Sequence, residues 1–216
     1  RMTYLEVVNN VLRRLREDEV TSVQDTTYSK MVGDFVNDAK RMVENAWDWS
    51  AARLTMTITT EEDVFNYVLT GTQNRLKVLD VINDTSNFFV EYRPQRWFDE
   101  HYLIQPVVKG TPQYYTFNAT DPAGDTQIDL YPKPDGVYKV RVNAIVRDDD
   151  LTQDAESVIV PSAPVIHYAV ALLARERGET GGVSAQEYFG IADRFLSDAI
   201  AIDAAKHPEE VIWSTP

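Results

Sequence analysis

Apolar residues recur at every third or fourth position in two segments within the first fifty residues, a spacing typical of amphipathic helices. The first segment covers residues 3–16, and Thr3 with Glu6 has the spacing of a capping box at its start. The second segment follows the turn 21-TSVQDTT-27 and extends to about Trp49. The pattern therefore predicts two helices, of which the second is the longer.

At 53-RLTMTITT-60 the apolar period falls to two, which predicts a half-buried strand. Turn-forming residues separate this run from further strand-like runs. The segment 94-PQRWFDEHYLI-104 interrupts the alternation, and we expect a short helix there that covers one sheet face. The block as a whole predicts an antiparallel sheet or a small sandwich. Its other strand-like runs are 64-VFNYVL-69, 75-RLKVLDVIN-83, 88-FFVEYR-93, 113-QYYTFNA-119, 126-TQIDLYP-132 and 137-VYKVRVNAIV-146.

The helical period returns after Pro161 and predicts two more helices, which the linker 178-GETGGVS-184 separates. The order helix, helix, strands, helix, helix indicates an α+β fold. We expect a helical bundle formed by the N- and C-terminal helices, a β-rich antiparallel insert between them, and an extended tail. The expected boundaries are 1–52 with 162–205 for the bundle, 53–161 for the insert and 206–216 for the tail.

Composition excludes several classes of protein. The chain has 216 residues, enough for one sizeable core, and no cysteine, so disulfides, thiolate catalysis and thiolate zinc sites are excluded. It holds neither an apolar run of about 18 residues nor a cationic start followed by an apolar stretch, and we expect no membrane span and no export signal. The net charge of −13 argues against tight binding of nucleic acid, since that binding depends on Lys and Arg neutralising phosphates. The same charge would suit a surface past which DNA moves without adhering.

No enzyme motif is found. The three histidines, His101, His167 and His207, lie far apart and lack a second ligand at helical spacing, and the glycines form no phosphate-binding loop. We therefore expect no catalytic activity, no cofactor and no metal.

The acidic run Asp148, Asp149 and Asp150 is the remaining candidate for chemistry. Three carboxylates could hold a hard cation such as Ca²⁺, but the spacing of a calcium loop is missing. Consecutive residues at a strand end also point in alternate directions, so their carboxylates do not readily converge. A solvated exit from the strand 137–146 is the simpler interpretation.

Aromatic residues offer an alternative function, since aromatic rings on turn-rich strands could stack on sugars. A glycan-binding β module carried on a helical base is therefore an alternative that stays open. Packing in the core or at an interface is the commoner use of such residues. The rings concerned are Trp47, Trp49, Tyr92, Trp97, Tyr114 and Tyr115.

The arrangement of elements resembles the tail tubular protein A family, the head-to-tail connector (adaptor) proteins of tailed bacteriophages. The resemblance rests on the helix pair closing on 46-AWDWSAARLTMTI-58, the β-rich insert, the acidic exit 147-RDDDL-151 and the helix opening 165-VIHYAVALLARERG-178. It implies a homo-oligomeric ring of twelve copies beneath the portal protein, in the neck of a virion assembled in the host cytoplasm. A nozzle or other tail protein would attach below the ring. DNA would pass through the channel without specific binding, and Asp148, Asp149 and Asp150 are candidates to line it.

The C-terminal segment 206-KHPEEVIWSTP-216 leaves the last predicted helix, because Pro208 cannot continue it. Val211, Ile212 and Trp213 in this tail would lose free energy if they stayed in water. Either they fold back on their own subunit, or, as the resemblance implies, they dock on the portal.

Overall fold

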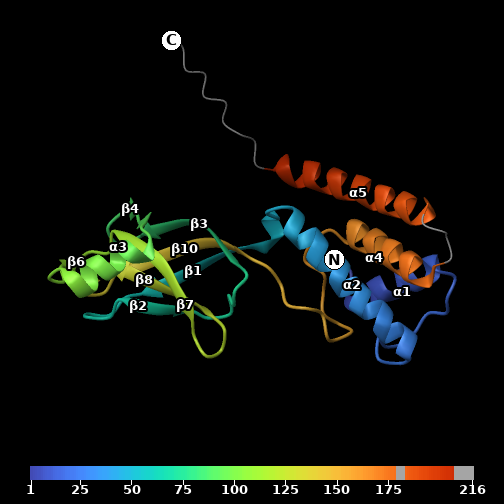
Figure 1. Ribbon diagram of the computed structural model, residues 1–216, viewed down its shortest axis with the longest axis horizontal. Helices are drawn as coiled ribbons and strands as arrows, with labels where there is room; N and C mark the ends of the chain where they lie inside the picture. The colour runs from blue at the N-terminus through green and yellow to red at the C-terminus, as the bar shows by residue number, and fades with distance from the viewer. Residues whose placement is uncertain (179–182, 207–216) are drawn as a thin grey trace, which may run out of the picture. The chain divides into compact units, whose positions relative to one another are not determined.

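The computed structural model describes residues 1–178 and 183–206, and they form two compact units (Figure 1). One unit holds residues 1–52 together with the described residues from 148 onward, and the other holds residues 53–147. The first is helical and the second is built of strands, which confirms the predicted α+β class.

The segment 148–161, which we expected in the insert, instead belongs to the helical unit. Leu151, Val158 and Val160 on this segment are buried in the core of the helical unit. The backbone N–H of Tyr4 also donates to the carbonyl of Glu156, at 2.7 Å. The sequence boundary was misplaced because the apolar run before Pro161 resembles a strand, although its side chains pack against helices.

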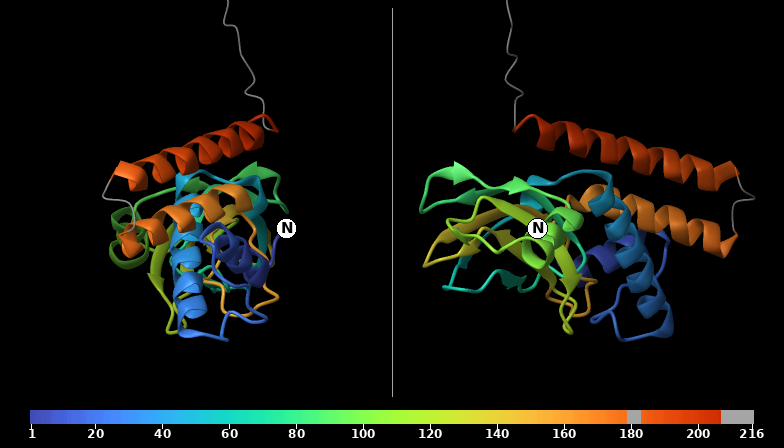
Figure 2. Two further views of the ribbon diagram at one scale, coloured as in Figure 1. Left: turned by 90° about the vertical axis from the view of Figure 1, so that its right-hand side faces the viewer. Right: turned by 60° about the vertical axis from the view of Figure 1, so that its left-hand side comes forward.

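The described residues of the helical unit form four α-helices: α1 (Tyr4–Arg14), α2 (Thr27–Ala46), α4 (Ser162–Arg177) and α5 (Val183–Ala204). The capping box predicted at Thr3 is confirmed, since its hydroxyl accepts from the N–H of Glu6 and the Glu6 carboxylate accepts from the N–H of Thr3. A second capping box joins Thr26 and Ser29 at the start of α2. Figures 1 and 2 show α4 and α5 lying side by side. None of the helices in the described ranges is long and apolar enough to cross a bilayer.

α2 ends at Ala46, earlier than the apolar pattern predicts. Trp47 has extended backbone angles, and Trp49 folds back so that its indole N–H donates to the carbonyl of Val43, at 2.7 Å. A 3-10 turn, η1 (Ser50–Ala52), then leads into the first strand. Both tryptophans continue the apolar spacing of the helix, although the chain has already left it.

The β unit holds two four-stranded sheets with the strand orders β1-β10-β3-β4 and β2-β8-β7-β5. Pairing is antiparallel apart from β5 with β7, and a small separate sheet pairs β6 with β9 in parallel. The strands are β1 (Arg53–Thr59), β2 (Asn66–Leu69), β3 (Leu76–Asn83), β4 (Phe88–Phe89), β5 (Glu91–Tyr92), β6 (Lys109–Gly110), β7 (Tyr114–Thr120), β8 (Thr126–Tyr131), β9 (Lys133–Pro134) and β10 (Lys139–Val146).

Both four-stranded sheets contribute to one apolar core, so the predicted sandwich is present. Ile58, Val81 and Val142 come from the first sheet, and Ile128 and Leu130 from the second. The predicted strand 88–93 is divided, because β4 pairs in the first sheet and β5 in the second. The chain therefore crosses between the sheets at Val90.

The predicted helix 94–104 is present as α3 (Gln95–Asp99), followed by a π-helical turn, η2 (Glu100–Ile104). Phe98 is buried, and Trp97 packs against Tyr114 of β7 and Tyr131 of β8, with ring centroids 4.9 and 5.1 Å away. The helical segment thus covers the second sheet on the face away from the shared core.

Candidate functional site

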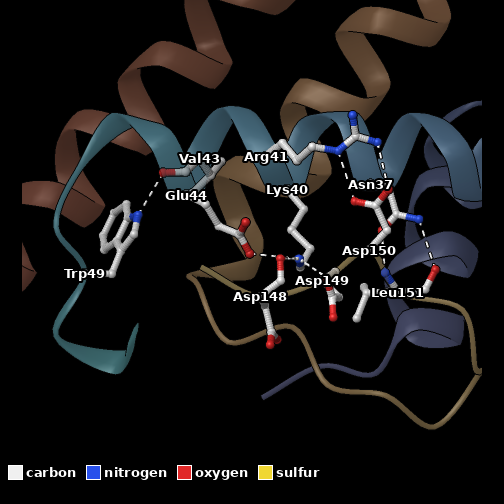
Figure 3. Close-up of polar contacts among 10 residues, drawn as sticks. All are labelled: Asn37, Lys40, Arg41, Val43, Glu44, Trp49, Asp148, Asp149, Asp150 and Leu151. Atoms are coloured by element: carbon white, nitrogen blue, oxygen red, sulfur yellow. Dashed lines mark hydrogen bonds and ion pairs between the residues drawn. The ribbon is translucent and has the colours of Figure 1, made fainter. Parts of the chain in front are cut away.

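The acidic run that follows β10 lies along α2, as Figure 3 shows. The Asp150 carboxylate pairs with the guanidinium of Arg41 through two hydrogen bonds, Nε to Oδ1 and Nη2 to Oδ2, each of 3.0 Å. This bidentate contact raises the pKa of Arg41 further above its ordinary value. Both side chains are about half exposed, so the pair adds little to stability.

Lys40, one residue earlier on α2, is completely buried. Its ammonium group forms an ion pair with Glu44 at 2.8 Å and donates to the carbonyl oxygens of Asp148, at 3.3 Å, and Asp149, at 2.7 Å. A buried cation is tolerated only when it is paired and hydrogen-bonded, and these three contacts meet that condition. Lys40 therefore holds the main chain of the acidic run against the helix.

Asn37 completes this row of contacts one turn earlier. Its side-chain amide donates to the carbonyl of Leu151 at 3.0 Å and accepts from the N–H of Leu151 at 2.8 Å, as a neighbouring strand would. Asn37, Lys40, Arg41 and Glu44 stand at positions i, i+3, i+4 and i+7, and so lie on one face of α2. Sequence reasoning missed them, although polar residues within an apolar helical stripe were a visible signal.

The carboxylates of the acidic run do not form a cation site. Asp150 is turned to Arg41, while the carbonyl groups of Asp148 and Asp149, and not their carboxylates, face Lys40 (Figure 3). Within residues 1–178 and 183–206, no group of three or more His, Asp or Glu side chains could hold a metal ion. The run works here as a main-chain attachment that returns the chain to the helical unit.

Two of the three histidines are packed against aromatic rings. The His101 ring stacks on Trp97 at 3.7 Å, and the His167 ring stacks on Phe195 at 4.1 Å. Burial, followed by the charge of Arg14, lowers the pKa of His167. The Nδ1 atom of His101 also lies 2.7 Å from the carbonyl oxygen of Trp97. These contacts favour a packing role for both rings.

Several of the aromatic residues considered for glycan binding are packed against other residues of their own unit. Trp49 and Tyr115 are buried, and Trp97 is packed between neighbouring rings. Tyr92 is 55% exposed in the β unit, whereas Trp47 belongs to the helical unit. For Trp49, Trp97 and Tyr115 the structure therefore favours packing over stacking on a sugar.

A second polar contact, also missed from the sequence, holds the end of α5. The buried Asp203 carboxylate accepts hydrogen bonds from the indole N–H of Trp47, at 3.1 Å, and from the backbone N–H and hydroxyl of Ser50, at 3.0 and 2.6 Å. Burial raises the pKa of Asp203, but these hydrogen bonds lower it by more, so the net shift is downward. The contact ties the C-terminal end of α5 to the segment that follows α2.

The tail residues Val211, Ile212 and Trp213, proposed from the sequence as a portal anchor, lie outside the described residues. The last described residue is Lys206, whose ammonium group lies 3.7 Å from Asp203. The tail therefore begins next to the contact that holds the end of α5.

No curated protein matches this chain. The family model described as SU10 adaptor protein matches residues 2–211, which include both units and the acidic run between them. Since the match spans nearly the whole chain, the protein belongs to the SU10 adaptor protein family, whose members are bacteriophage adaptors, structural parts of the virion at the junction of head and tail.

Proposed function

We propose that this protein forms a ring beneath the phage portal, joins the portal to the tail and leaves a channel through which DNA passes. Membership of the adaptor family over residues 2–211 is the observation that carries the proposal. The narrower resemblance to the tail tubular protein A family adds the number of twelve copies and a nozzle or similar protein as the tail-side partner. The role is structural, and no catalytic step is part of it.

Exposed apolar side chains support assembly with other copies or proteins. Besides the residues that pack on α4, α5 exposes large side chains at positions 188, 191 and 202, on the same side of the helix as Phe195, which stacks on His167 of α4. Each is at least 39% exposed, and Ile202 is 69% exposed. Apolar side chains that stay exposed beside the contact with α4 make this helix suited to a second partner.

The tail supplies the proposed attachment to the portal. Tryptophan is the residue most enriched at interface positions that carry large shares of binding energy, and Val211 and Ile212 would extend its apolar contact. We expect deletion of residues 209–216 to weaken portal binding by about 2 kcal/mol or more, roughly thirtyfold, because a buried anchor is lost. Titration of purified portal with the full-length and shortened chains measures this difference.

Thermal unfolding of the same two chains is the control. An unchanged melting temperature with weakened attachment supports docking of Val211, Ile212 and Trp213 on the portal. A lower melting temperature with normal attachment would show that the tail packs on its own subunit, and this part of the proposal would be wrong.

The net charge of −13 per chain is relevant to how DNA would pass the wall of the proposed channel. If acidic side chains line it, they repel the DNA backbone, and Asp148, Asp149 and Asp150 are the candidates, with Asp149 and Asp150 exposed. We expect the purified protein, alone and assembled on the portal, to show no tight DNA binding at physiological salt. Gel-shift titration checks this, and a submicromolar dissociation constant would contradict the proposed channel surface.

A further inference from the structure

The most exposed large apolar side chains of the β unit lie at the end of η2. Leu103 and Ile104 are each 80% exposed, and Val107 and Val108 follow at 43% and 53%. We call these four residues the apolar knob. Single exposed apolar residues are common on proteins, but four within six positions form a patch of the kind that marks an interaction site.

The backbone that carries the knob is held on both sides. Before it, the Tyr102 hydroxyl donates to the carbonyl of Leu130, and the N–H of Gln105 donates to the carbonyl of Glu100 at 2.9 Å. After it, the N–H of Lys133 donates to the carbonyl of Val108 at 3.0 Å. A knob fixed in this way loses little conformational entropy when a partner covers it, which favours binding.

The same unit carries a hollow of complementary character where the chain crosses between the two sheets. It has a volume of about 290 Å³ and is lined by Phe88, Phe89, Glu91, Gln113 and Tyr114. We call it the aromatic hollow. A cavity of about 150 Å³ holds a benzene molecule, so this hollow has room for two aliphatic side chains such as those of Leu103 and Ile104.

Charges near the two features are also complementary. Arg93 lies over the Tyr114 ring of the hollow at 4.6 Å, and Arg96 follows it in the first turn of α3. Asp99 and Glu100, both exposed, lie four and three residues before the first residue of the knob. Arg93 also pairs with Glu91, which lines the hollow, at 3.1 Å, so two arginines and one glutamate lie in the chain near the hollow, whereas the two acids Asp99 and Glu100 lie near the knob. The ten residues of α3–η2 span roughly 15 Å at the helical rise, which keeps the two features apart on one copy.

We infer that the apolar knob of one copy fills the aromatic hollow of the next copy. The contact joins two different surfaces of the same chain, so it is heterologous and builds a ring when the rotation between copies closes. Asp99 and Glu100 of one copy would then approach Arg93 and Arg96 of the next, which sets the orientation. The inference rests on the proposed self-assembly and specifies the surfaces that carry it.

The absence of cysteine from the sequence allows a direct test by cross-linking. A variant with Ile104→Cys and Phe89→Cys, assembled with the portal and treated with a short thiol-reactive cross-linker, should give a ladder of linked copies under denaturing conditions. Each single variant alone should give no ladder. An equimolar mixture of the two single variants should give linked pairs and nothing larger, because each copy then offers only one reactive surface.

A second variant tests whether the contact contributes to assembly. Replacing Leu103 and Ile104 by glutamine should weaken self-association roughly thirtyfold with an unchanged melting temperature, because both side chains are exposed in the single copy. Val137→Gln is the matched control, since Val137 is an exposed aliphatic residue of the same β unit, at 68% exposure, that belongs to neither the knob nor the hollow. Mass measurement of assemblies over a range of protein concentrations gives the comparison.

The outcomes separate this inference from the proposed function. A ring that forms normally but gives no ladder, or an unchanged mass for the glutamine variant, would overturn the inference and leave the adaptor role standing. Loss of tail-protein binding with normal rings would assign the knob to that partner instead of a second copy. A chain that stays monomeric, alone and with the portal, would overturn both.

Discussion

Replacing Lys40 by methionine is expected to lower the free energy of unfolding by about 3–5 kcal/mol, the usual cost of removing one partner from a buried ion pair. The change leaves the Glu44 carboxylate buried without its lysine partner, at a position where the two were 2.8 Å apart. It also takes the ammonium donor from the carbonyl groups of Asp148 and Asp149. Denaturant unfolding, followed by the fluorescence of the buried Trp49 beside α2, measures the loss.

The neighbouring residue provides a matched control. Arg41→Met also removes one positive charge from α2, but the Arg41–Asp150 pair is about half exposed, and such pairs contribute only about 0–1 kcal/mol. The double variant Lys40→Met, Glu44→Leu should recover part of the loss, because an apolar pair can replace a buried ion pair. It should not recover all of it, since the two carbonyl groups still lack their donor.

Equal losses from Lys40→Met and Arg41→Met would contradict this account, because burial is the difference between the two residues. A double variant no more stable than Lys40→Met would instead show that the donation to Asp148 and Asp149, and not the pair with Glu44, provides the stability.

The sequence pattern was sufficient to predict helices, strands and caps that depend on residues close together in the chain. The capping box of Thr3 and Glu6, the helix over 94–104 and the seven strand-like runs each follow from spacing within about ten residues. The class of the fold followed from their order. Strand pairing, such as β1 with β10 or β2 with β8, joins segments about sixty to ninety residues apart, and single-strand patterns do not encode it.

The contacts that hold the acidic run were not predictable by the same means. Asn37 and Lys40 bind residues more than one hundred positions away, and their value depends on burial that only the folded chain creates. Alternation along the strand was the reason to expect carboxylates that do not converge, and the Asp150 carboxylate is turned to Arg41. The sequence nevertheless placed segment 148–161 in the wrong unit. Trp49 shows the same limit, because its helical spacing concealed a turn held by its own indole group.

The exposed knob and the aromatic hollow were also beyond the sequence pattern. Leu103 and Ile104 are apolar residues of the kind that usually lies in a core. In the folded chain they stand at the end of the π-helical turn η2, where both are exposed to solvent. Phe88, Phe89 and Tyr114 come from two strands that belong to different sheets. Such surfaces depend on tertiary structure, so their partners can be proposed only after the fold is known.

Asp203→Asn is expected to cost about 2–3 kcal/mol near neutral pH. The carboxylate accepts three hydrogen bonds, from Trp47 and from the N–H and hydroxyl of Ser50, and hydrogen bonds to a charged group contribute about 1.5–3 kcal/mol. An asparagine keeps one acceptor oxygen but turns an NH₂ group toward the remaining donors. Asp198→Asn is the control, because Asp198 is exposed on the same helix and such a change usually alters stability by at most about 0.5 kcal/mol.

The stability that Asp203 contributes should depend on pH, and the direction of that dependence follows from the shift of its pKa. The pKa of Asp203 is lowered on folding from its ordinary value of 3.8, so the folded state binds its proton less tightly than the unfolded state does. The stabilisation is therefore fully present above pH 3.8 and is lost as the pH falls through the folded-state pKa. We expect the difference in unfolding free energy between the natural chain and Asp203→Asn to be constant from pH 7 to pH 5 and to shrink below pH 4. Denaturant titrations at pH 7, 5 and 3.5 measure it, and a difference that grows toward acid pH would show that burial, not hydrogen bonding, governs this carboxylate.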